Sequence, residues 1–123
     1  MADGLSATVA NAALSTIIGT DANNVQLHTG APGAAGTANV SSVTTRPAVT
    51  WGSPSAGSVA ASNQPAWTNW AGTSPETDTD LSFWSASTSG TFGFSCQLSS
   101  SVVMNTGDSL TLTAITVSIP VAS

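Results

Sequence analysis

The stretch VQLHTGAPG at residues 25–33 contains the only histidine of the chain. A histidine that acts as a general base needs a nucleophile or an orienting carboxylate within reach. The sequence offers no GxSxG nucleophile motif and no second histidine with which His28 would form a recognisable set. Strand alternation also places His28 opposite Val25 and Leu27, on the outer or strand-end side. We therefore predict a hydrogen-bonding strand-end histidine that is not catalytic.

The single cysteine is the second candidate for chemistry, because a reactive thiolate can act as a nucleophile. Cys96 alternates in phase with the apolar residues Phe92, Phe94 and Leu98 along TFGFSCQL. This phase predicts a small core residue rather than a reactive thiol. One cysteine also excludes a disulfide within the chain.

Three carboxylates follow one another at a spacing of two in SPETDTD, residues 74–80: Glu76, Asp78 and Asp80. In a strand they would project from one face and repel each other, whereas in a loop they could hold a calcium ion. The stretch lacks the glycine and terminal glutamate of a calcium loop. Paired carboxylates could also hydrolyse glycosides, but nothing in the sequence predicts a cleft around them. We expect a solvated acidic loop, no metal, no cofactor and no enzymatic activity.

The chain has four tryptophans: Trp51, Trp67, Trp70 and Trp84. They could form a platform on which sugar rings stack, or they could fill a core or a subunit interface, where tryptophan is enriched. The second interpretation is favoured. Trp84 falls out of phase with Leu81 and Phe83, which predicts a surface aromatic that faces away from their core.

Charge is scarce, since charged residues make up 6% of the chain against about 25% in an ordinary protein. Arg46 is the only cation and the formal net charge is −5. Nucleic acids and anionic membranes are therefore excluded as partners, because both require several Lys or Arg contacts. We predict that Arg46 forms a fixed ion pair with an acidic residue of this chain or of a neighbouring subunit, the candidates in the chain being Glu76, Asp78, Asp80 and Asp108.

At 123 residues the chain fits one domain. Its first residues have no basic region and too few apolar residues to cross a bilayer, so neither a signal peptide nor a transmembrane helix is expected. A surface rich in Ser, Thr, Ala and Gly suits permanent contact with neighbours, because short side chains lose little rotamer entropy on burial.

Residues 1–20 are expected to form a helical unit on or beside the body, with the helix over residues 4–18. Ser6 or Asp3 would cap its start, and Gly19 stands where a helix-ending glycine belongs. Its apolar residues form two stripes on roughly opposite sides, one of Leu5, Val9, Ala12, Thr16 and Ile17, the other of Ala10, Leu14 and Ile18. We predict that one stripe packs on the body and that the second, Ala10, Leu14 and Ile18, meets a partner; the alternative is a helix buried wholly in its own core.

Residues 21–123 are expected to form a single antiparallel β-sandwich, jelly-roll-like, so that the fold is mainly β with one N-terminal α-helix. Short alternating segments lie between Gly, Pro, Asn and Ser turns, at residues 25–28, 48–51, 57–62, 66–70, 81–85, 91–98, 102–104 and 109–121. In the last segment Leu110 and Leu112 alternate in one phase, and Ile115 and Val117 in the other. Such a slip predicts a β-bulge or a strand that changes sheets.

Three motifs in this order carry a resemblance to a known family: LHTGAPG at residues 27–33, RPAVTW at residues 46–51 and NTGDSLT at residues 105–111. The sequence resembles small virion structural proteins of tailed bacteriophages, particularly those of actinobacteria. Members of this family are described as head decoration, head fibre, minor capsid or minor tail proteins. The resemblance spans nearly the whole chain and implies no enzymatic residues. The central WTNWAGTSPETDTDL departs from the family pattern.

The resemblance implies a virion structural protein, assembled in the cytoplasm of the host bacterium. The first expectation is a head decoration protein that stabilises the shell by binding the major capsid protein. The alternatives are a minor tail or fibre-like adsorption protein and, outside virions, a carbohydrate-binding module that uses the tryptophans. We expect a homo-oligomer, with a trimer favoured over other closed symmetries.

Overall fold

The computed structural model describes residues 3–122 of the chain. Residues 1, 2 and 123, which the predicted ranges 1–20 and 21–123 include, lie outside the described residues. The elements are α1 (Ala7–Thr16), a π-helical turn η1 (Ile17–Asp21), β1 (Asn24–His28), β2 (Ser58–Ala60), β3 (Ala66–Trp67), β4 (Glu76–Trp84), β5 (Phe92–Met104), β6 (Leu110–Thr111) and β7 (Thr116–Ser118). All strand pairs are antiparallel. The predicted fold class, mainly antiparallel β with one N-terminal α-helix, is confirmed.

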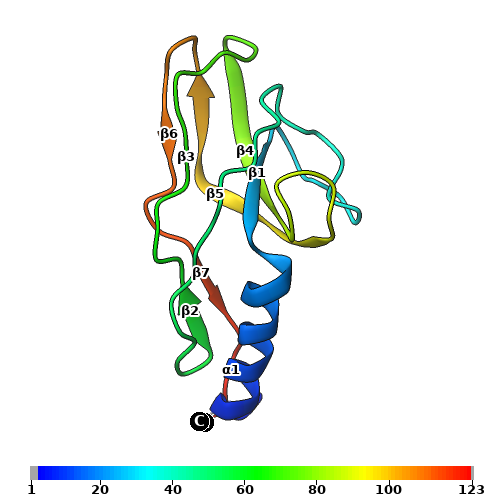
Figure 1. Ribbon diagram of the computed structural model, residues 1–123, viewed down its shortest axis with the longest axis vertical. Helices are drawn as coiled ribbons and strands as arrows, with labels where there is room; N and C mark the ends of the chain where they lie inside the picture. The colour runs from blue at the N-terminus through cyan, green and yellow to red at the C-terminus, as the bar shows by residue number, and fades with distance from the viewer. Residues whose placement is uncertain (1–2, 123) are drawn as a thin grey trace.

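The strands form three small sheets along an elongated body. β1, β4 and β5 make a three-stranded sheet, and the pairs β2–β7 and β3–β6 make two more. Figure 1 shows α1, β2 and β7 toward one end of the long axis, and the other two sheets toward the opposite end. Apolar side chains from the three-stranded sheet and from the β3–β6 sheet meet in one core, which includes Leu27, Trp67, Phe83 and Met104.

The three-stranded sheet has an apolar face and a polar face. Val25 pairs with Phe83 and Leu27 with Leu81, and these four residues belong to the core. Because successive side chains alternate, Gln26, His28 and Ser82 lie on the opposite face. An irregular segment, residues 30–48, runs alongside β1. The Val25 N–H donates a hydrogen bond to the Pro47 carbonyl, and the Ser41 N–H donates one to the Leu27 carbonyl.

The last part of the chain changes sheets, as the phase slip predicted. β6 pairs with β3, whereas β7 pairs with β2 in a different sheet. The turn Asn105–Asp108 before β6 is also confirmed, with a backbone bond of 2.9 Å from the Asp108 N–H to the Asn105 carbonyl. Gly107 has φ of +87°, a conformation that a residue with a Cβ adopts only at a cost.

The helix differs from its prediction at both ends. Ser6 caps it by accepting a hydrogen bond from the Val9 N–H at 3.2 Å, so the first turn begins later than residue 4. At the other end the α-helix does not stop at Gly19 but widens into η1, which contains that glycine. The Asn11 side chain links α1 to the body, because its Oδ1 accepts a hydrogen bond from the Gly57 N–H at 2.9 Å.

The roles of the two helix stripes are corrected. Ala10 and Leu14 are fully buried within the chain itself, whereas Leu5 and Val9 are 43% and 53% exposed. Ile18 is half-buried. The stripe predicted to meet a partner is therefore the one that packs on the body, because the neighbouring sheet β2–β7 and the C-terminal chain lie under it. A Cβ added at Gly57 would meet the backbone carbonyl of Ile119 and the side chain of Val121, which shows how closely these segments approach.

Two strands extend beyond their predicted bounds, and one segment forms less regular structure. β4 begins at Glu76 rather than at Leu81, and β5 continues without a break into the predicted strand at residues 102–104. Residues 48–51 contribute only isolated bridges at Ala48 and Trp51. Register shifts within β4–β5 let the strands bend, which the simple alternation of the sequence does not encode.

Candidate functional site

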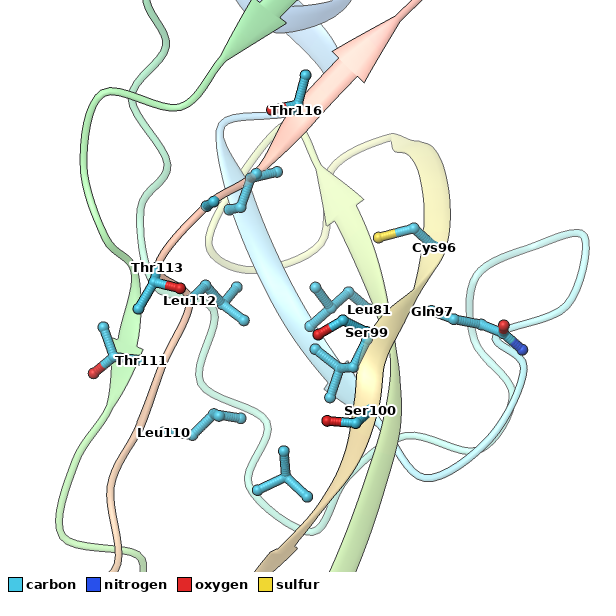
Figure 2. Close-up of a pocket in the computed structure, with 14 residues that line it drawn as sticks. Leu81, Cys96, Gln97, Ser99, Ser100, Leu110, Thr111, Leu112, Thr113 and Thr116 are labelled. Atoms are coloured by element: carbon cyan, nitrogen blue, oxygen red, sulfur yellow. The ribbon is translucent and has the colours of Figure 1, made fainter.

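An open groove runs along one side of the body between β5 and the chain that contains β6. Its volume is about 430 Å³. Figure 2 shows Cys96, Ser99 and Ser100 on β5 and Leu110 and Leu112 on the facing segment, with Leu81 of β4 between them. β5 and the segment that contains β6 therefore stay apart on this side, and the core is partly open to solvent.

The groove is neutral and mixed in polarity. Its lining residues are Leu81, the β5 residues 96–100 and 102, and residues 110–116, and none of them carries a charge. Leu98, Val102, Leu110 and Ile115 are half-buried and pack against the core cluster, while the serines beside them are exposed. The sequence predicted these residues, except Ser99 and Ser100, as strand positions. It did not predict the groove, because whether the core is open depends on how far β5 lies from the segment that contains β6.

The prediction that Cys96 is a core residue is wrong. Its position opposite Leu81 places it on the core face as expected, but the residue is exposed because nothing covers the groove there. Desolvation by its neighbours and, secondarily, the Asp80 carboxylate raise the pKa of the Cys96 thiol above its usual value. A raised pKa lowers the thiolate fraction at neutral pH, which supports the expectation of a thiol of low reactivity.

His28 is buried in the polar face of the sheet, not exposed at its outer side. It does lie opposite Val25 and Leu27, but the loop at residues 30–39 covers it and leaves it 0% exposed. Its Nδ1 lies 2.8 Å from the Ala38 carbonyl, which can only accept, so Nδ1 carries the proton. Nε2 then accepts from the Ser82 hydroxyl at 2.6 Å, and Ser82 accepts from the Trp84 indole at 2.7 Å.

A serine and a histidine at this distance resemble the pair that activates a nucleophile. Here Ser82 and His28 are both 0% exposed, so a substrate has no path to the hydroxyl. The chain of donors and acceptors is complete, which stabilises a polar layer inside the protein. We assign this network a structural role.

The network predicts how His28 affects stability. Burial lowers the pKa of His28 below 6.5, although hydrogen bonds to backbone carbonyls partly oppose this. The unfolded chain binds a proton as the pH falls through 6.5 and the folded chain does not, so His28 makes folding less favourable toward acid pH.

We expect His28→Ala to lose about 2 kcal/mol of unfolding free energy near neutral pH, because the Ser82 hydroxyl and Ala38 carbonyl lose their partner. The variant should also lack the loss of stability toward acid pH that the buried imidazole causes in the wild type. Urea titrations at several pH values, with wild type alongside, measure both effects. Equal stability of the two proteins at every pH would contradict the buried network.

Arg46 does not form the predicted ion pair with an acid of this chain. Its guanidinium lies 4.1 Å from the centre of the Trp84 ring and donates to the carbonyls of Ala86 at 3.2 Å and Ser89 at 2.8 Å. It also donates to the Gln26 side chain at 3.3 Å. Within residues 3–122 no carboxylate forms a salt bridge with it, because Arg46 sits over the aromatic side of the polar face and is satisfied there by carbonyls and a π-system.

Trp84 faces away from Leu81 and Phe83, as predicted, but it is not a surface aromatic. The ring is 7% exposed because Arg46 and Phe92 cover it. A register shift beside Phe83 brings Phe92 onto the Trp84 side, whereas Phe94 stacks on Phe83 at 4.5 Å. Phe92 therefore does not share the core face with Phe94, in contrast to the sequence alternation.

The other tryptophans are also structural. Each indole N–H has a fixed acceptor in the backbone: Ala22 for Trp51, Thr45 for Trp67 and Thr73 for Trp70. A second cavity of about 290 Å³ lies beside Trp67 and Trp70, whose side chains are only 4% and 2% exposed. Their rings are therefore unavailable as an open platform for sugar stacking, and the core interpretation of the tryptophans agrees with the structure.

The three clustered acids lie in β4 rather than in a solvated loop, so that prediction is wrong. Glu76, Asp78 and Asp80 are 8%, 0% and 7% exposed. Burial alone would raise the pKa of Glu76, but bonds from the Ser41 hydroxyl at 2.6 Å and the Ser42 N–H at 3.0 Å hold it below its usual value. Over residues 3–122 no group of three or more ligand-type side chains is arranged to hold a metal ion.

Asp78 is the least satisfied polar group of this cluster. Neither of its carboxylate oxygens has a hydrogen-bond partner. Burial and then the neighbouring Glu76 raise the pKa of Asp78 from 3.8 to about 7. The side chain is therefore largely protonated in slightly acidic solution, which removes a buried unpaired charge. The sequence showed that these acids would repel in a strand, and protonation is how the fold accommodates them.

The described residues form a small β-rich body with a neutral groove. In the described part of the chain, no helix is long and apolar enough to cross a membrane. A neutral groove of this kind is a surface through which a protein can contact other chains.

A comparison with protein families gives the particular family. Residues 1–120 match the family described as Podophage GP4 fiber I protein gp80. The match covers nearly the whole chain, and the protein belongs to this family. No curated protein matches the chain. The protein is thus a phage structural protein of a fibre family, associated with the virion.

Proposed function

We propose that this protein is a fibre component on the outside of the phage particle, assembled from several copies of the chain. The observation that carries the proposal is the match of residues 1–120 to a family described as a fibre protein. It favours the fibre alternative over head decoration, the function that the sequence analysis placed first. A trimer is the favoured form of the assembly.

The structure supports this proposal in two ways. The body is elongated, with the β2–β7 sheet toward one end of the long axis and the other two sheets toward the opposite end (Figure 1). All four tryptophans are wholly or largely covered and have internal acceptors, which argues against the carbohydrate-binding alternative.

Electron cryomicroscopy of purified particles, combined with labelling by an antibody against this chain, tests the location. We expect label on thin projections, with few copies per particle. Label spread evenly over the shell, at a copy number that follows the capsid lattice, would establish head decoration instead and overturn the proposal. Particles without label would show that the chain is absent from the virion surface.

A further inference from the structure

The two edges of the three-stranded sheet differ in whether another chain segment covers them. The β1 edge is covered, since backbone bonds join Val25 to Pro47, Ser41 to Leu27 and Thr29 to Asn39. The β5 edge is not: from Ser95 to Val103 no backbone hydrogen bond reaches any described segment other than β4. On either side of the bulge between Gln97 and Val102, this edge presents backbone groups that can pair with another strand.

Natural proteins usually protect such an edge with charges, proline or a covering segment. Residues 92–107 contain no charged residue and no proline. Serines line most of the exposed edge, and Val103 is 54% exposed beside them. Against pairing, the β5 edge therefore has neither charge nor proline, but a bulge interrupts it, because the ladder with β4 passes from Gln97 directly to Val102.

The open groove lies directly beside this edge. Cys96, Ser99 and Ser100 point from β5 toward Leu110 and Leu112 (Figure 2). A strand that paired with β5 would place its side chains over the groove and cover the half-buried apolar residues Leu98, Leu110 and Ile115. Edge pairing and closure of the core would thus occur in one step.

We propose that this open side, formed by β5 residues 95–103 and the facing residues 110–116, is the contact with a second copy of the chain. Charge selects this occupant, because the lining is uncharged and a nucleic acid or other charged partner would leave its own charges unpaired there. A second copy presents the same neutral edge and the same incomplete core. This inference rests on the proposed self-association and is independent of where in the particle the protein lies.

The native thiol gives a direct test on the unmodified chain. Sedimentation velocity over a range of concentrations should show association, and the rate of maleimide labelling of Cys96 should fall at least tenfold as the oligomer forms, because the partner covers the groove. A chain that stays monomeric at high concentration overturns the inference. Association that leaves the labelling rate unchanged also overturns it, because the contact then lies elsewhere.

A pair of matched variants tests the same surface. Ser100→Lys adds a charge inside the groove at an exposed residue, and Ser53→Lys adds the same charge at an exposed residue outside it. We expect Ser100→Lys to weaken association at least tenfold and Ser53→Lys to leave it unchanged, with circular dichroism showing both folded. Equal association of both variants overturns the inference. A failure here leaves the fibre proposal intact, since that proposal is tested on particles.

Discussion

Leu14→Asp is expected to release helix α1 from the body and to lower the free energy of unfolding by about 4 kcal/mol. Leu14 is 0% exposed and lies in the stripe that packs on the chain itself. An aspartate at this position would place a charge without a partner in an apolar contact, one of the few single changes with an effect of this size. Urea unfolding followed by circular dichroism measures both the lost stability and the lost helix signal.

Val9→Asp is the matched control, because it makes a comparable change on the exposed side of the same helix. Val9 is 53% exposed, and an acid in the first turn interacts favourably with the helix dipole. We expect a change of less than about 0.5 kcal/mol. A loss at Val9 as large as at Leu14 would contradict this assignment, because it would show that the exposed stripe is also in contact with protein.

Asp78→Asn is expected to stabilise the protein at alkaline pH by about 4 kcal/mol. The unfolded chain loses its proton near pH 3.8, whereas folded Asp78 holds it until about pH 7. Folding therefore becomes less favourable as the pH rises between these values, and the full penalty is present above pH 7. Each pKa unit corresponds to about 1.4 kcal/mol, and asparagine avoids the penalty because it never ionises.

The gain should disappear toward pH 4, where aspartate and asparagine are both neutral in the fold. Asp3→Asn removes the same charge at an exposed position and should not reproduce the effect. Thermal or urea unfolding from acid to alkaline pH measures all three proteins. A variant that is less stable than wild type at alkaline pH would mean that the Asp78 carboxylate has a favourable partner in the fold.

The class of fold was predictable because alternation and turn residues are local signals. The sheet change between β6 and β7 followed from the phase slip between Leu112 and Ile115, and the Ser6 cap followed from residue type. Neither depends on distant contacts. The prediction that Val25 and Leu27 lie on the inward face of β1 was also correct, since both are 0% exposed.

Burial on the second face of the sheet could not be predicted in the same way. The alternation placed His28 and Trp84 opposite the core, but only the fold shows that the loop at residues 30–39 and the Arg46 guanidinium cover them. Cys96 illustrates the reverse case, because it faces the core side where no segment covers it. In each case the sequence alternation predicts on which face of the strand a residue lies. Whether another segment covers that residue depends on contacts between residues far apart in the chain.

The arrangement of the strands along the body also has a mechanical consequence. The upper parts of β4 and β5 run lengthwise in Figure 1, and their interstrand hydrogen bonds lie across that direction. Tension along the body would load these bonds in shear, so that many must break together before the strands slide. The pairs β2–β7 and β3–β6 have registers of only three and two residues. Under a pulling force they would yield first, while the three-stranded sheet would bear the load.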